Sequence, residues 1–490
     1  MITINDCEQA GYYEYKGLST DTKPTNCYVN SLFLELDTGY FYYFDGSTWV
    51  KTKSGDGYST FKSLIDRSIT EVTEEMTEDV GYIGDSAFYG CSHLTNVKVG
   101  SRISCVYPFA FYYCSALKSV DLSNGVSEVW ECAFEWCYSL KTLKLGNSLR
   151  SIGGSSFKGC IDLPEITIPN DTKTIGGSAF EGCSGATKLF LPDTLKSIGE
   201  FAFKDCSSIS SISIPSSIKS IERCTFENCS GATSLSLSNV EYVGECAFKG
   251  CSSLTSLNIP STLLKLDKWA FQDCSSITNI LYSGTSQGTT NLEYIGDFCF
   301  SGCTSLKYVY IPNTTARNWW AGSSFAGCTA LKTVKIQSGV NRIGDSTFQG
   351  CTSLETINFP GSLSYGNIGD KAFMGCTSLE KIKVDEGVKL IGISAFEGCT
   401  HLHTVDLPSS LDDIISSRAF NYVGLQSITI IAEWPPKLGE NVFKIWQGID
   451  PSSVIPPLYP KIYVPSNLVE RYKQTAGWNN YENYIKAIPS

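Results

Sequence analysis

Cysteine is the residue type in this sequence with the greatest capacity for chemistry, and the 490 residues include 21 cysteines. Thiols can serve as nucleophiles, metal ligands or disulfide partners. No Cys-x-x-Cys pair, the spacing on which most zinc sites depend, occurs in the sequence. This absence and a regular spacing indicate a structural role, so we expect no metal site. Fourteen cysteines recur three residues after a phenylalanine: Cys91, Cys114, Cys137, Cys160, Cys183, Cys206, Cys229, Cys251, Cys274, Cys303, Cys328, Cys351, Cys376 and Cys399.

If the repeated segments stack at about 4.8 Å per repeat, these cysteines form one column. That spacing lies within the Cα separation of disulfides, so distance alone leaves bridges open. A column of identical positions nevertheless gives no cysteine a preferred partner, and pairing neighbours would distort a regular stack. We therefore expect a ladder of buried free thiols and folding in a reducing compartment.

Other catalytic chemistry lacks the residues it needs. Only three histidines occur, His93, His401 and His403, and each lies beside a strand-like segment. No Gly-x-Ser-x-Gly elbow, phosphate-binding loop or His-Glu-x-x-His motif is present. We therefore expect no catalytic residues, no bound cofactor and no enzymatic activity.

The charge and hydropathy of the chain limit its partners. The formal net charge is −11 and the pI is near 5.0, which disfavours binding to nucleic acid or to anionic membranes. No run of 18 apolar residues occurs, so we expect no insertion into a membrane. The first residues, Met1 to Glu8, contain neither a basic nor an apolar segment, so we also expect no secretory signal.

The cysteines are positioned by a repeat, seen clearly in Ile83 to Leu94, Ile-Gly-Asp-Ser-Ala-Phe-Tyr-Gly-Cys-Ser-His-Leu. Each copy continues into a segment that alternates apolar and polar residues, such as Leu94–Val99 or Leu331–Ile336, as a half-buried strand does. A fixed period of this length predicts a solenoid, in which repeats bury their apolar sides only by stacking. The phenylalanine recurs, mostly at 23-residue steps, at Phe88, Phe111, Phe134, Phe157, Phe180, Phe203, Phe226, Phe248, Phe271, Phe300, Phe325, Phe348, Phe373, Phe396 and Phe420.

The register of each repeat separates core from surface. The Ile or Val five residues before each phenylalanine, the phenylalanine itself, and the apolar residues six, nine and eleven after it should point inward. Residues seven, eight and ten after it should point outward, where a partner would bind, and most are Ser, Thr, Lys, Asn or Glu. The exceptions, with one residue of a nearby insertion, are our candidate partner-binding residues: Phe190, Leu281, Tyr308, Tyr310 and Trp319.

The period also breaks near these candidates. Phe271 and Phe300 are 29 residues apart, and Phe300 and Phe325 are 25 apart. The extra residues fall after the strands, at 283–291 and near 317–321. Insertions in solenoids often flank a binding face. Trp320 takes a core position, which leaves Trp319 as the exposed residue. The alternative is an incidental aromatic surface that binds no partner.

Residues 83–430 resemble the leucine-rich repeats of the BspA-like type, whose pattern is Ile-Gly-x-x-Ala-Phe-x-Gly-Cys-x-x-Leu-x-x-Val-x-Leu-Pro. The resemblance implies a β-rich α/β leucine-rich repeat solenoid, right-handed, with about 15 repeats of 23 residues and a parallel sheet on its concave face. It also implies turns or short helices on the opposite side. The asparagine column of generic leucine-rich repeats is missing, and a cysteine column before the strand replaces it.

The segments on both sides lack the repeat. Residues 1–55 carry two alternating segments around Asp37-Thr38-Gly39 and predict a β-hairpin or small meander. Residues 56–82 contain a linker and an apolar, acidic stretch suited to cap the first repeat. Residues 431–490 are rich in proline and predict a strand at Lys461–Val464, a short helix and a C-terminal cap.

Two stretches of the N-terminal module, Phe33-Leu-Glu-Leu-Asp-Thr-Gly39 and Tyr42-Tyr-Phe-Asp-Gly-Ser-Thr-Trp49, resemble a short β module of structural and fibre proteins of tailed bacteriophages. The resemblance implies homo-oligomerisation or virion attachment through residues 1–55. Our first hypothesis is therefore a non-catalytic phage fibre, decoration or receptor-binding protein, assembled in the bacterial cytoplasm. Its repeats would contact a host-surface protein or glycan. The alternatives are a cell-surface or secreted bacterial adhesin of the BspA-like class and an intracellular protein-interaction scaffold.

Overall fold

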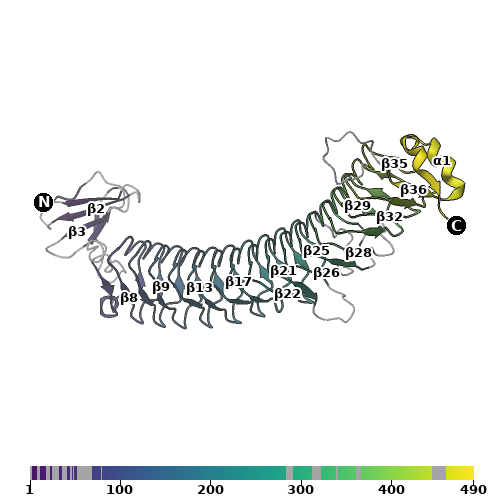
Figure 1. Ribbon diagram of the computed structural model, residues 1–490. Coiled ribbons are helices and arrows are strands. Elements are labelled where there is room, and N and C mark those ends of the chain that lie inside the picture. Colours follow the sequence, from purple (N-terminus) through teal and green to yellow (C-terminus); the bar gives the residue numbers. More distant parts are fainter. Residues whose placement is uncertain are drawn as a thin grey trace. The chain divides into compact units, whose positions relative to one another are not determined.

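The computed structural model describes residues 3–7, 12–17, 22–24, 32–35, 41–44, 47, 49–51, 69–78, 80–282, 291–311, 322–337, 340, 342–359, 366–443 and 459–489 (Figure 1). These residues divide into two compact units, Met1–Ser156 and Phe157–Ser490, which are described in turn. Strands make up most of the regular structure in both units, and the one α-helix of the described residues is α1 (Val469–Gln474).

The first unit begins with a five-stranded sheet made by residues that lack the repeat. In spatial order its strands are β1 (Thr3–Cys7), β2 (Tyr12–Gly17), β3 (Leu32–Glu35), β4 (Phe41–Phe44) and β5 (Trp49–Lys51). β2 and β3 are parallel, and the other neighbours are antiparallel. The two alternating segments on either side of residues 37–39 pair with Phe33 opposite Tyr42, which is a hairpin arrangement.

The rest of the first unit consists of stacked repeats, each with two short strands. A long-strand ladder follows the leucine six residues after each stacked phenylalanine, and a short-strand ladder contains the isoleucine or valine five residues before it. Both ladders are parallel. The long-strand ladder contains β6 (Glu71–Val72), β8 (Asn96–Lys98), β10 (Ser119–Asp121) and β12 (Thr142–Lys144). The short-strand ladder contains β7 (Tyr82–Ile83), β9 (Cys105–Val106), β11 (Glu128–Val129) and β13 (Ser151–Ile152).

The second unit repeats the same two parallel ladders. Its long strands are β14 (Glu165–Thr167), β16 (Lys188–Phe190), β18 (Ser211–Ser213), β20 (Ser234–Ser236), β22 (Ser256–Ile259), β24 (Asn279–Tyr282), β26 (Tyr308–Ile311), β27 (Thr333–Ile336), β28 (Thr356–Asn358), β30 (Lys381–Lys383), β32 (Thr404–Leu407), β34 (Ser427–Ile430), β36 (Lys461–Val464) and β37 (Ile485–Ala487). Its short strands are β15 (Thr174–Ile175), β17 (Ser197–Ile198), β19 (Ser220–Ile221), β21 (Tyr242–Val243), β23 (Lys265–Leu266), β25 (Tyr294–Ile295), β29 (Asn367–Ile368), β31 (Leu390–Ile391), β33 (Ile414–Ile415) and β35 (Lys437–Leu438).

The predicted parallel-sheet solenoid is confirmed, with about 16 turns of about 23 residues and little helix. The sequence predicted one strand per repeat, whereas the structure has two. The second strand was missed because it is only two residues long, as in Ser197–Ile198. Two residues cannot show the alternation by which a half-buried strand is recognised.

The third side of each repeat is the Phe turn, which we define as the five residues centred on the stacked phenylalanine. Its backbone also pairs with the next repeat: the N–H of Phe180 donates to the carbonyl of Ala202, and the N–H of Gly182 to that of Lys204, both at 2.8 Å. The last residue of the turn has a positive φ, 73° at Gly182 and 59° at Asn228. Glycine and asparagine tolerate this conformation better than other residues, which explains their recurrence here.

The core is a column of stacked phenylalanine rings. In the second unit Phe180, Phe203 and Phe226 stack with centroid separations of 5.6 and 5.3 Å and interplanar angles of 2° and 8°. Each ring is fully buried. Such stacked pairs stabilise a fold beyond the area they bury, because the rings lie at favourable offset distances.

Stacking continues past residue 430, where the recognisable repeat ends. Phe443 stacks on Phe420 at 6.0 Å, and the buried Trp478 packs against Phe443 at 6.1 Å. The Trp478 indole N–H donates to the Pro436 carbonyl at 2.7 Å, and the Tyr472 hydroxyl donates to the Ala432 carbonyl at 2.9 Å. One more phenylalanine-centred turn therefore precedes the segment that covers the column. Phe443 follows Phe420 at the regular step of 23 residues, but no cysteine lies three residues after it.

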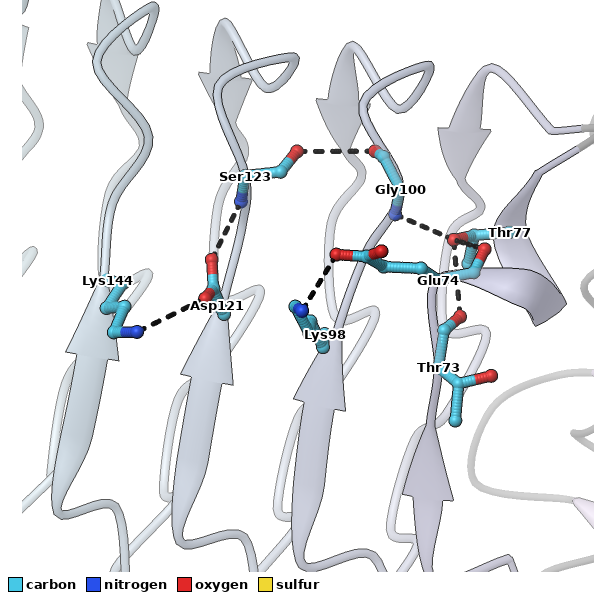
Figure 2. A network of polar contacts seen from close by, with 8 residues as sticks. All are labelled: Thr73, Glu74, Thr77, Lys98, Gly100, Asp121, Ser123 and Lys144. Atoms are coloured by element: carbon cyan, nitrogen blue, oxygen red, sulfur yellow. Dashed lines mark hydrogen bonds and ion pairs between the residues drawn. The ribbon is translucent and has the colours of Figure 1, made fainter.

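A 3-10 turn, η3 (Glu75–Thr77), lies beside the first long strand of the first unit (Figure 2). The buried Thr77 hydroxyl accepts a hydrogen bond from the N–H of Gly100 at 2.8 Å and donates to the Glu74 carbonyl at 2.9 Å. The Glu74 carboxylate lies 3.0 Å from Nζ of Lys98 on the next strand. This acidic stretch therefore contacts the first repeats directly, whereas residues 56–68 of the predicted cap lie outside the described residues.

We expect Phe203→Ala to lower the free energy of unfolding by about 3 to 5 kcal/mol, because it leaves a cavity in a close-packed column. Urea denaturation followed by far-UV circular dichroism measures the change. Ser211→Ala, at an exposed position on β18, is the control and should leave the stability within about 0.5 kcal/mol of the parent. A loss below about 1 kcal/mol for Phe203→Ala would contradict the role assigned to the column.

Candidate functional site

The cysteine column serves the fold rather than chemistry. Along the column, thiols donate to the carbonyl oxygen of the stacked phenylalanine one repeat earlier: Cys206 to Phe180 at 3.1 Å, and Cys399 to Phe373 at 3.2 Å. Both cysteines are completely buried. A thiol is small, tolerates an apolar environment and is a weak donor, so it fills this space and satisfies a buried carbonyl at once.

Burial also makes these thiols inert. Loss of hydration raises the pKa of Cys251, Cys351 and Cys399 to about 12, so the reactive thiolate is scarce at neutral pH. The cysteines of residues 91–399 are free thiols. Buried thiols with a raised pKa are slow to react with oxidants in solution. The column is therefore compatible with an oxidising compartment as well as with the reducing one that the sequence suggested.

We expect the free energy of unfolding to fall as the pH rises from about 9 to 12. In the unfolded chain these thiols lose their protons near their ordinary pKa of 9.0, whereas in the folded chain they keep them to about pH 12. The unfolded state then binds fewer protons, so stability is fully present below pH 9 and is lost above it. Urea unfolding at pH 8, 9, 10 and 11 measures the slope.

The matched variant carries Cys251→Ala, Cys351→Ala and Cys399→Ala together. It should show a shallower decline over the same pH range, although its stability at pH 8 is lower. The other buried thiols of the column and the tyrosine and lysine side chains still titrate in the variant and set the residual slope. Identical slopes for parent and variant would contradict the proposed effect of the buried thiols.

The outward positions of the long-strand ladder are where the candidate residues lie. In the second unit Phe190 on β16 is 53% exposed, Leu281 on β24 is 57% exposed and Tyr308 on β26 is 40% exposed. Tyr310, two residues further along β26, is half-buried. The fourth position of β24, Tyr282, contributes a ring 6.3 Å from that of Tyr310. The strand register thus places these residues at the surface.

The structure brings only some of the candidates together. Asn279 of β24 pairs with Tyr308 of β26, so Leu281 and Tyr310 occupy the next outward positions of neighbouring strands. The ammonium of Lys335, on the adjacent β27, lies 5.9 Å from the Tyr310 ring centroid. Burial raises the pKa of Tyr308, and the neighbouring Tyr310 adds to the rise. We call Leu281, Tyr308, Tyr310 and Lys335 the β24–β27 patch.

Two of the candidates lie apart from the β24–β27 patch. Three repeats separate Phe190 from Leu281, and their equivalent outward residues are Ser213, Ser236 and Asn258. At about 4.8 Å per repeat the separation is roughly 19 Å. Trp319, with the neighbouring insertions, lies outside the described residues.

In the first unit the same outward positions are charged (Figure 2). Lys98 on β8 pairs with Glu74, and Lys144 on β12 lies 3.5 Å from Asp121 on β10. Opposite charges on neighbouring strands satisfy one another, which favours this face as a solvated surface rather than a ligand site.

The sequence did not single out the outward residues of the short-strand ladder as a possible site. In the second unit the Lys265 ammonium lies 5.1 Å from the Tyr242 ring and 5.2 Å from the Tyr294 ring. Lys265 also pairs with Asp267 at 3.1 Å, and the Tyr242 hydroxyl donates to Asp267 at 2.7 Å. Lys265 is 23 positions from Tyr242 and 29 from Tyr294, and the three side chains meet only because of the parallel register. The chain itself supplies the cation of this cluster, which is the Lys265 ammonium.

The stacked repeats and their outward columns define a leucine-rich repeat solenoid, a fold typical of non-catalytic binding proteins. The model of the BspA type leucine rich repeat region matches residues 58–187, 150–278, 235–317, 285–367 and 321–449. The chain therefore belongs to the BspA-type leucine-rich repeat family. This family assignment agrees with the resemblance seen in the sequence.

The chain is also similar to several solved structures. A leucine-rich repeat protein from Bacteroides ovatus is 24% identical, with a TM-score of 0.55, over 100% of this chain and 98% of that chain. A leucine rich cell surface protein from Faecalibacterium prausnitzii is 25% identical, with a TM-score of 0.40, over 64% of this chain and 79% of that one. The pneumococcal vaccine antigen PcpA is 17% identical, with a TM-score of 0.39, over 94% and 100%. No curated protein sequence matches the chain.

These comparisons give no support to the phage-like prediction for residues 1–55 or to a virion role. The family model begins at residue 58. Within the described part of the chain, no helix has both the length and the apolar composition needed to cross a bilayer.

Proposed function

We propose that this protein is a non-catalytic recognition protein of a bacterial cell surface, which binds a host-surface protein through the β24–β27 patch. The observation that carries the proposal is the exposure of Leu281 and Tyr308 beside Tyr310, on a ladder whose outward residues are mostly small and polar. Tyrosine is enriched at protein interfaces, where its ring is buried and its hydroxyl stays hydrogen-bonded.

The chemistry of the patch favours a protein partner over a glycan. Leu281 offers an aliphatic contact, Tyr308 and Tyr310 offer rings with hydroxyls, and Lys335 brings a positive charge to the edge. An apolar centre with a polar rim is the usual composition of a protein interface. Strands β1 to β5 form a sheet of their own, and we propose that residues 1–55 attach the repeats to a support or to further copies of the chain.

Two considerations support a surface adhesin over the phage hypothesis. The repeats by themselves favour the BspA-like adhesin class, and family membership rests on those repeats. The phage hypothesis relied partly on a reducing compartment, and the buried high-pKa thiols remove that requirement. An intracellular scaffold remains the third hypothesis, because the same patch would bind a cytoplasmic protein equally well.

We expect the double variant Tyr308→Ser/Tyr310→Ser to weaken cell binding about tenfold or more, because it removes the aromatic contacts of the patch. Fluorescently labelled protein added to epithelial cells, and to the same cells after protease treatment, measures binding by flow cytometry. Protease treatment should abolish binding if the partner is a protein. The melting temperature should stay within about 2 °C of the parent, because neither ring belongs to the stacked core.

Phe190→Ser is the matched control, since it removes an exposed aromatic residue from the same ladder, five repeats away from Tyr308 and Tyr310. It should leave cell binding unchanged. Normal binding by the double variant would exclude the β24–β27 patch, and binding that survives protease would replace the protein partner with a glycan. Binding to bacterial rather than epithelial cells would favour the phage hypothesis.

A further inference from the structure

A second exposed surface lies on the first unit, on and beside successive Phe turns. We call it the aromatic turn surface, and its members are Tyr89, Tyr107, Phe109, Tyr112, Tyr113 and Trp130. Tyr89 stacks on Tyr112 at 5.0 Å, and Tyr107 stacks on Trp130 at 5.5 Å. Tyr113 is 49% exposed, Tyr89 44% and Phe109 40%. Aromatic rings of neighbouring repeats thus stack on one another outside the core.

The fold does not require aromatic rings at these positions. The residue after the stacked phenylalanine is Tyr89 or Tyr112 in the first two repeats of the first unit and Glu135 in the third. In the first repeats of the second unit it is Lys158, Glu181 or Lys204. There the side chains form ion pairs across repeats, such as Lys158 with Glu181 at 3.1 Å. The same backbone hydrogen bonds connect the turns in both units. Stability therefore does not explain the rings, and a large exposed apolar group points to binding.

The segments that form the aromatic turn surface contain acidic residues but no basic ones. Segments 82–93, 105–116 and 128–139 contain no lysine or arginine. They contain four carboxylates, of which Asp85 and Glu131 are exposed and Glu128 and Glu135 are half-buried. Burial raises the pKa of Tyr112, and the nearby Glu135 carboxylate adds to the rise. The surface therefore combines electron-rich ring faces with negative charge, both of which attract a cation.

In the second unit, aromatic rings near carboxylates lie against basic side chains of the chain itself. There Lys265 lies between the Tyr242 and Tyr294 rings and pairs with Asp267. On the Phe turn, Arg223 lies 5.2 Å from the centroid of the Phe201 ring. Phe201 occupies the same place in its repeat as Phe109 does on the aromatic turn surface. The second unit thus supplies its own cations, whereas the corresponding segments of the first unit contain none.

We propose that the aromatic turn surface binds a lysine- or arginine-rich segment of a partner protein. The basic side chains would lie against the exposed rings, and their charges would face the carboxylates of Asp85, Glu128 and Glu131. This surface is independent of the β24–β27 patch, since it belongs to the other unit and has the opposite chemical preference. The chain is then a two-site binding protein, with a second partner defined by positive charge.

Isothermal titration of the full chain with a nine-residue arginine peptide tests the proposal. We expect Tyr89→Lys to weaken binding about tenfold, because it places on the surface the cation that the second unit has at this position. We expect a similar loss from Glu128→Gln/Glu131→Gln. The Tyr308→Ser/Tyr310→Ser variant should bind the peptide normally, so failure of this proposal is distinct from failure of the β24–β27 patch.

The acidic chain as a whole attracts any polycation, so a charge-matched control is needed. Glu165→Gln/Glu293→Gln removes two exposed carboxylates from the second unit and should leave the affinity unchanged. A nine-residue serine peptide and a neutral hexasaccharide should not bind. Equal losses from both Gln pairs, normal binding by Tyr89→Lys, or saccharide binding that depends on Tyr89 would each overturn the proposal.

Discussion

The spacing between consecutive repeats is the constraint on which the rest of the structure depends. Backbone N–H groups of each Phe turn donate to carbonyls of the next repeat, and both strand ladders pair in the same direction. This distance lets the phenylalanine rings stack, with centroids 5.3 Å apart for Phe203 and Phe226. It also brings the thiol of Cys229 within 3.2 Å of the Phe203 carbonyl. One period therefore sets the backbone ladders, the core and the cysteine column together.

Because every repeat must meet the same inward requirements, functional variation is confined to outward columns. The repeat position of Tyr89 and Tyr112 holds alternating glutamate and lysine from Glu135 to Lys249 without disturbing the stack. The outward column of the long strands likewise changes from serine at Ser236 to leucine at Leu281. A solenoid of this kind can acquire or lose a binding surface by a few substitutions, since each outward residue contacts mainly its neighbours in the same column.

Much of the candidate site followed from the register of the strands. Successive residues of a strand face opposite sides, so the exposure of Phe190, Leu281 and Tyr308 could be predicted once the repeat was aligned. The same rule applies only to strand positions. It therefore does not predict the exposure of Tyr89 and Tyr113 on the Phe turn. The signal was present as a high density of aromatic residues in segments 82–138. This density does not by itself show which rings are exposed, because a turn has no two-residue alternation to separate inward from outward positions.

The sequence by itself determined the period, the class of solenoid and which side chains enter the core, because a repeated apolar pattern admits one way of stacking. Only the tertiary structure decided which outward residues of neighbouring repeats meet. Lys265 lies between Tyr242 and Tyr294 because parallel register and side-chain direction together place an ammonium over two rings. Such contacts depend on distances of a few ångströms between residues 23 or more positions apart, and these distances exist only once the repeats have stacked.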